Sequence, residues 1–179
     1  NWVTAAASWH TPIPHVIRLS GGTLLAVHSQ QNNVAKTLKV SSYSPATSAW
    51  TTVNVLLDDA AEQKGPSLVE LPDGGVLLFV QSSDDQQVDA YLSEDAGATF
   101  AIYARRVLGT VPGTADIREV KAAYSAGEIL LVVAYRDGSS NRTAATYYSG
   151  DLGCSFAQVE DDWRTTTTNT EDPESFCVL

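Results

Sequence analysis

Hydrophobic and polar positions along the chain follow a pattern that occurs three times. Each time, a short alternating segment, a glycine-containing turn and a more apolar segment follow one another, over residues 16–27, 68–80 and 120–133. Alternation with a period of two is typical of β-strands. The glycines that align in the three turns, Gly22, Gly75 and Gly127, are spaced roughly 50 residues apart. The pattern therefore predicts an all-β protein built from repeats.

Each repeat is long enough for four strands. The order is strand, tight turn, apolar strand, polar loop, alternating strand, second turn and final strand. The second repeat opens with strands expected at 66–71 and 76–81. The latter is apolar nearly throughout, as in a strand buried on both faces. A four-stranded repeat of this length predicts the blade of a β-propeller.

The second turn of a repeat carries a recurring motif, Ser-x-Asp-x-Gly-x-x-aromatic. Its aspartate and serine side chains can accept hydrogen bonds from backbone N–H groups of the turn. Its glycine permits a positive φ, and its phenylalanine can bury a ring between sheets. In the first repeat, residues 42–50 keep a serine and Trp50 but contain neither aspartate nor glycine. The two full copies are Ser93, Asp95, Gly97 and Phe100, and Ser149, Asp151, Gly153 and Phe156.

Two such motifs in register within a longer repeat resemble the Asp box, or BNR repeat, of the sialidase-like β-propellers. The resemblance implies that the motif is structural and lies between the third and fourth strands of a blade, away from the active face. We therefore expect Asp95 and Asp151 to hold turns and to take no part in chemistry.

The repeats predict a single, partial propeller over residues 1–179, which the family resemblance extends to six blades. The expected boundaries are about 11–55, 65–107 and 118–159 for three blades, with a fourth beginning at about 173–179. Three blades cannot close a ring, and an open ring exposes apolar faces and strand edges. The remaining blades of the same propeller are therefore one expected partner.

The composition of the chain argues against several classes of partner. The net charge of −10 and the pI near 4.5 argue against partners that are nucleic acids or anionic membranes, and no apolar run approaches the ~20 residues of a membrane span. His10, His15 and His28 show no metal-ligand spacing, so we expect neither a metal nor a cofactor. Scarce lysine and abundant serine and threonine favour a secreted protein, and Asn141 begins an N-glycosylation sequon.

The two cysteines leave two interpretations open. Cys154 lies inside the second motif turn and Cys177 lies in an apolar run. They are two buried thiols or they form one disulfide, and the first interpretation is favoured.

In the sialidase-like family the ligand face is formed by loops between the second and third strands of a blade and by loops between blades. The first blade of the family carries a substrate-binding arginine within a Phe/Tyr-Arg-Ile-Pro motif. Here the corresponding segment, 11–14, has Pro12 in place of that arginine. The family's acid/base aspartate follows in the next loop, but residues 29–33 contain no carboxylate. Proline cannot hold a carboxylate, so we expect no cleavage of sialosides.

Other side chains on the expected loops could still act on a sugar. Glycoside hydrolysis needs two carboxyl groups roughly 5 to 10 Å apart. The candidates are Glu119, expected at the start of an inner strand, with Asp116 and Asp137, followed by Asp84 and Asp85. The alternative for each is a solvated loop charge. Arg118 is expected either to bind a substrate carboxylate or, more readily, to form an ion pair. The tryptophans Trp2, Trp9 and Trp163 could stack on sugar rings or pack between blades.

Two functions follow from these observations. The first, which the absent arginine and aspartate favour, is a non-catalytic extracellular propeller that binds a glycan or a protein, or serves in assembly. The alternative is a glycoside hydrolase of the sialidase superfamily that acts on a sugar other than a standard sialoside.

Overall fold

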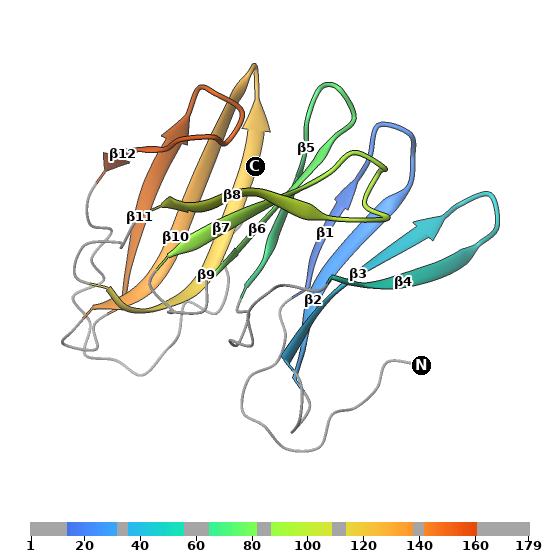
Figure 1. Ribbon diagram of the computed structural model, residues 1–179, viewed down its shortest axis with the longest axis horizontal. Helices are drawn as coiled ribbons and strands as arrows, with labels where there is room; N and C mark the ends of the chain where they lie inside the picture. Colours follow the sequence, from blue (N-terminus) through green and yellow to red (C-terminus); the bar gives the residue numbers. More distant parts are fainter. Residues whose placement is uncertain are drawn as a thin grey trace.

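The computed structural model describes residues 14–31, 36–55, 65–81, 87–108, 114–137 and 142–160. These residues form three four-stranded sheets, whose neighbouring strands are antiparallel and follow one another in sequence (Figure 1). The prediction of an all-β fold is confirmed. The first sheet contains β1 (His15–Arg18), β2 (Leu24–Gln31), β3 (Lys36–Ser44) and β4 (Ala49–Val55); the second contains β5 (Ser67–Glu70), β6 (Val76–Gln81), β7 (Val88–Ser93) and β8 (Ala101–Leu108); the third contains β9 (Thr114–Ser125), β10 (Glu128–Asp137), β11 (Arg142–Ser149) and β12 (Ala157–Glu160).

The first hairpin of each sheet turns at a glycine with positive φ. These glycines are Gly22 (φ 88°), Gly74 (φ 86°) and Gly127 (φ 94°). The sequence alignment was wrong in placing Gly75 with Gly22. In the structure, Gly22 N donates to Leu19 O and Gly74 N donates to Leu71 O in the same way. Gly74 therefore occupies the position that requires a residue without a Cβ.

The middle sheet is packed on both of its faces, and β6 shows this most clearly. Leu77 and Phe79 belong to the core shared with the third sheet, whereas Leu78 and Val80 belong to the core shared with the first. Every residue of β6 is buried. This confirms the expectation from its apolar sequence, because alternate side chains of a strand point to opposite faces.

The first strands of the three sheets lie side by side in the order β1, β5, β9 (Figure 1). Among the described residues, hydrogen bonds at these strands connect neighbouring sheets. Leu68 N donates to His15 Nδ1 (2.9 Å), Val120 N donates to Gly65 O (3.0 Å), and Ala122 N donates to the Ser67 hydroxyl (2.9 Å). These bonds satisfy backbone groups that the ladders of the sheets leave unpaired.

The assembly has two ends. At the turn end, at the top of Figure 1, lie the hairpins β1–β2, β5–β6 and β9–β10. At the opposite, loop end, β1, β5 and β9 begin and β2, β6 and β10 finish. The described part of the chain has no helix that could cross a bilayer.

Candidate functional site

The three candidate carboxylate residues come together at the loop end of the third sheet. Asp116 pairs with Arg136 in the register of β9 and β10, Glu119 pairs with Ala134, and Asp137 pairs with Thr114. Glu119 was expected at the start of an inner strand and lies within β9. Asp116 and Asp137 were expected in loops, which was wrong, because β9 begins at Thr114 and β10 continues to Asp137. For Asp116 and Asp137 the description covers the backbone alone.

A β-bulge shapes this end of β9. Ile117 and Val120 are three residues apart, yet both are fully buried in the same core. A regular strand would place them on opposite faces. The register shift opposite Ala134 and Tyr135 inserts one extra residue into β9, so both side chains reach the core. Arg118 and Glu119 lie between them, at the bulge.

Glu119 is a buried acid. Its side chain forms an ion pair with Lys121, with 2.9 Å between Oε1 and Nζ, and the whole residue is 4% exposed. Burial raises the pKa of the Glu119 carboxyl, and the hydrogen bond and charge of Lys121 only partly oppose that effect. A carboxyl group with a raised pKa holds its proton to higher pH and can donate it to a leaving group.

Gly65 makes room for this acid. A Cβ at position 65 would lie 2.7 Å from Glu119 Cα and 2.8 Å from its Cγ. Real Cβ atoms do not come that close, so β9 can approach the start of the second sheet only because residue 65 has no side chain.

His15, which belongs to the first sheet, is the third polar residue of the candidate site, with Glu119 and Lys121. Its Nδ1 accepts the hydrogen bond from Leu68 N, which leaves the ring proton on Nε2. Burial first, and then the charge of Lys121, lower the pKa of His15 to about 4. His15, Lys121 and Glu119 therefore place a neutral imidazole, an ammonium and a carboxyl group near one another.

The His15 ring makes stability depend on pH. Its folded pKa of about 4 lies below the ordinary 6.5, so the unfolded chain binds a proton between these values and the folded chain does not. Stability should therefore decrease as the pH falls from 6.5 to 4 and should change little further from this group below 4. Because the ring is half-buried and partly screened, we expect a loss of about 1 to 2 kcal/mol.

The control is His15→Asn, whose side-chain oxygen can accept the Leu68 N–H bond but does not titrate. Urea unfolding at pH 7 and at pH 4 gives the change in stability of each protein. Subtracting the two changes leaves the contribution of His15, because Glu119, whose contribution has the opposite sign, is present in both proteins. An identical pH dependence in the two proteins would contradict the assignment.

The two Ser-x-Asp-x-Gly turns have the same internal hydrogen bonds. Asp95 accepts from Thr99 N (2.7 Å), the Thr99 hydroxyl (2.6 Å) and the Ser93 hydroxyl (2.7 Å), while Gly97 N donates to the Ser93 hydroxyl (2.8 Å). Asp151 receives the corresponding bonds from Ser149 and Ser155, and Gly153 N donates to Ser149. The hydrogen bonds from Thr99 and Ser155 contribute most to lowering the pKa of Asp95 and of Asp151 to about 2.

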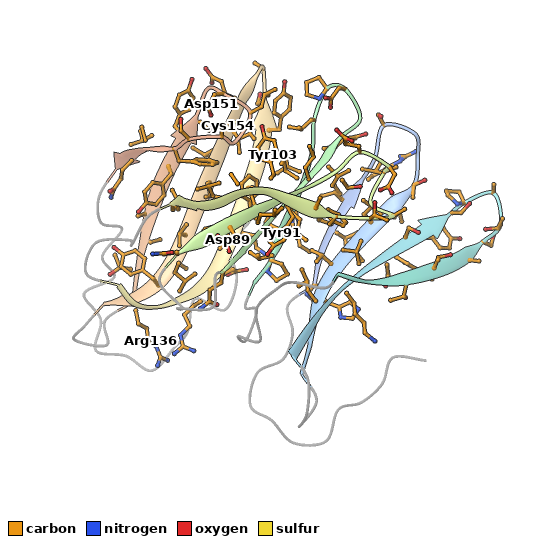
Figure 2. All side chains as sticks on the ribbon, viewed as in Figure 1. Asp89, Tyr91, Tyr103, Arg136, Asp151 and Cys154 are labelled. Carbon is orange, nitrogen blue, oxygen red and sulfur yellow. The ribbon has the colours of Figure 1, made fainter. Side chains whose placement is uncertain are left out.

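These turns lie far from the candidate acids. Figure 2 places Asp151 at the turn end and Arg136 at the loop end of the third sheet. The role of the residue four positions after each aspartate was not predicted, although a residue with a hydroxyl group stands there in both copies of the motif. After the second turn, Phe156 packs edge-on against Phe79 of the middle sheet, with ring centres 5.8 Å apart.

Asp95→Ala should lower stability by about 1 to 2 kcal/mol, since it leaves the Thr99 N–H and two hydroxyls without their acceptor. Ligand binding at the loop end should not change. Thermal unfolding and ligand titration of the same preparation measure both effects. Lost binding at an unchanged melting temperature would assign the turn a direct role in the site.

Cys154 differs from the expectation of a buried thiol. It is a free and exposed cysteine, because Gly153 faces the preceding sheet and the next residue faces outward. Its sulfur lies 2.9 Å from the Tyr103 hydroxyl of the middle sheet (Figure 2). This hydrogen bond, with burial, raises the pKa of Tyr103 to about 12.

Several predicted positions lie outside the described residues, and so do most of the loops expected to form the ligand face. Within the described residues, no three His, Cys, Asp or Glu side chains could together hold a metal ion. The positions outside are Trp2, Trp9, Pro12, Asp84, Asp85, Asn141, Trp163, Cys177 and the segment 173–179.

Comparison with known proteins identifies the fold. An α-L-arabinofuranosidase from Fusarium graminearum superimposes with a TM-score of 0.66 at 18% identity, over 86% of this chain and 49% of that protein. An α-L-arabinanase from Penicillium chrysogenum gives 0.61 at 17% identity, over 86% and 51%. The Hadza microbial sialidase Hz136 gives 0.66 at 12% identity, over 83% and 37%. The chain has a sialidase-like β-propeller fold.

This chain spans about half the length of the arabinofuranosidase, and these identities establish the fold alone. No protein-family model matches the chain, and no curated protein matches it.

Proposed function

We propose that this chain is part of an extracellular β-propeller that binds a glycan at the loop end, and that the Ser-x-Asp-x-Gly turns are Asp boxes of its scaffold. The group His15, Lys121 and Glu119 carries the proposal. It supplies donors and acceptors at a position where three first strands meet, and sugar hydroxyls are recognised by a few polar groups of this kind.

The similar structures suggest which glycan to test first. One is an arabinofuranosidase bound to arabinobiose, at 19% identity and a TM-score of 0.64. We therefore propose arabinose oligosaccharides as the first ligand class. The sequon at Asn141 and the composition of the chain support the extracellular setting.

Glu119 favours a second function, hydrolysis of such a glycan. Its raised pKa suits a proton donor. Hydrolysis also needs a second carboxylate across the scissile bond, for which Asp116 and Asp137 are the proposed candidates. Sialosides are not the proposed substrates, because Pro12 stands in place of the family's arginine and residues 29–33 contain no aspartate.

One experiment addresses both functions. The intact protein is applied to a glycan array and incubated with chromogenic arabinofuranosides, with a chromogenic sialoside as the substrate control. We expect arabinose oligosaccharides to bind, and Glu119→Gln to weaken that binding by about tenfold. Asp95→Ala, at the other end of a sheet, is the control for general destabilisation.

The outcomes separate the functions. Turnover of an arabinofuranoside that Glu119→Gln reduces at least about 100-fold supports hydrolysis. Binding without turnover supports the non-catalytic function. Absence of both, in a protein with a cooperative unfolding transition, would overturn glycan recognition and leave a protein ligand as the alternative.

A further inference from the structure

The third sheet extends beyond the middle sheet at the loop end. Its first strand, β9, has 12 residues, whereas β5 has 4. Its second strand, β10, has 10 residues, whereas β6 has 6. Ala134 and Gln81, the last residue of β6, follow the positive-φ glycines of their hairpins at the same distance along the chain. The residues of β10 beyond Ala134 therefore have no counterpart in β6.

A row of charged residues crosses this extension. Arg136 in β10 pairs with Asp116 in β9 and with Arg142 in β11. Tyr135 belongs to the core shared with the middle sheet, so the next residue, Arg136, lies on the opposite, outer face. Cross-strand partners share a face, and we call these three residues the arginine row. For Asp116 and Arg142 the description covers the backbone alone, which determines their strand and register.

The arginine row carries more positive than negative charge. Like charges directly opposite each other in neighbouring strands repel, and one carboxylate balances only one of two guanidinium groups. Arg136 is half-buried, and among the side chains that the structure describes none forms a hydrogen bond or ion pair with it. Arginine does not lose its charge in proteins. An anion held between the two arginines would remove the repulsion through charge-assisted N–H···O bonds.

The arginine row adjoins the candidate site. Ala134 pairs with Glu119 in the register of β9 and β10, and Arg136 is the next residue of β10 on the face of Ala134, about 7 Å further along the strand. Figure 2 shows Arg136 at the loop end of the sheet. A ligand bound at Glu119 can therefore reach the row. The net charge of −10 disfavours anions over the rest of the surface, so any attraction of an anion is local.

We propose that the arginine row binds an anionic group of the glycan, either the carboxylate of a uronic acid or a sulfate ester. Both groups offer the oxygen atoms that a guanidinium fork binds. The inference rests on the proposed function, because it names a chemical class for the glycan at the loop end. The row lies on the third sheet and is distinct from segment 11–14, where the sialidase-like family carries its arginine.

Isothermal titration calorimetry of the intact protein tests the inference. The probes are an arabinose trisaccharide, a galacturonic acid trisaccharide, the uncharged methyl ester of that acid, and a sulfated galactose trisaccharide with its unsulfated form. We expect an anionic probe to bind at least about tenfold more tightly than its uncharged form, and added salt to reduce this difference. The pair of probes that shows the larger difference identifies the anionic group.

Substitutions in the row should remove this difference. Arg136→Gln and Arg142→Gln should each make the anionic probe bind no more than about twofold better than its uncharged form, and should leave binding of the arabinose trisaccharide unchanged. Arg136→Lys keeps the charge but cannot form two parallel bonds, so it should give an intermediate difference. The control is Arg18→Gln, the same substitution at an exposed residue of the turn end, which should leave the difference intact.

Equal binding of the charged and uncharged probes, with the arabinose trisaccharide still bound, would overturn the inference and leave the proposed function standing. A difference that survives either glutamine substitution would also overturn it. If no probe binds, the proposed function fails and the inference fails with it. Urea unfolding checks that each variant folds, and if Arg136→Gln does not fold, an undiminished difference in Arg136→Lys gives the same negative answer.

Discussion

Alanine at position 65 should destabilise the protein by about 3 kcal/mol and weaken ligand binding at the loop end. Its Cβ would lie 2.7 Å from Glu119 Cα, and a backbone atom cannot move away as a side chain can. The start of β9 would shift, and the bond from Val120 N to Gly65 O would lengthen. Urea unfolding and the array measurement record the two effects.

Gly21→Ala is the control for this prediction, because a Cβ there meets nothing within 4 Å and Gly21 has no positive φ. It should leave stability and binding near the wild-type values. If Gly65→Ala were as harmless as Gly21→Ala, the close approach of β9 to the second sheet would be wrong.

Gly97→Ala should cost about 2 to 3 kcal/mol, for two separable reasons. The residue has a φ of +89°, and its new Cβ would lie 2.6 Å from Leu25 Cδ1. Gly74→Ala isolates the first effect, since Gly74 has a φ of +86° and open space around it. The excess of Gly97→Ala over Gly74→Ala in urea unfolding measures the contact between sheets.

A double-mutant cycle with Leu25→Ala completes this test. Without the leucine methyl groups, Gly97→Ala should cost no more than Gly74→Ala. An unchanged cost in the Leu25→Ala background would mean that the glycine is needed for its backbone conformation alone.

Much of the scaffold could be predicted because its signals are local. The nearly continuous apolar run of residues 76–81 predicted a strand with the bounds that the structure gives to β6. Asp95 and its turn were recognised because the donors it binds lie within four residues along the chain. The hydroxyl partner Thr99 was missed, although its position is readable from the two copies of the motif.

The candidate site was predicted less well because its geometry is not local. Glu119 could be proposed as an acid, but its pairing with Lys121 and its raised pKa depend on burial within the fold. The pairing of β9 with β10 continues past the bulge opposite Ala134 and Tyr135, so Asp116 and Asp137 lie in strands. Such a bulge depends on which side chains fit the core, and periodicity cannot locate it.

The sequence by itself therefore determined the repeat, its four strands, its polar turns and the β-propeller fold. These features depend on alternation and on turn residues that act within a few positions of one another. Only the tertiary structure decided that the charge of Lys121 acts on His15 and that Gly65 accommodates Glu119. These contacts join residues of different sheets, and they are determined by packing and desolvation, which depend on the whole fold.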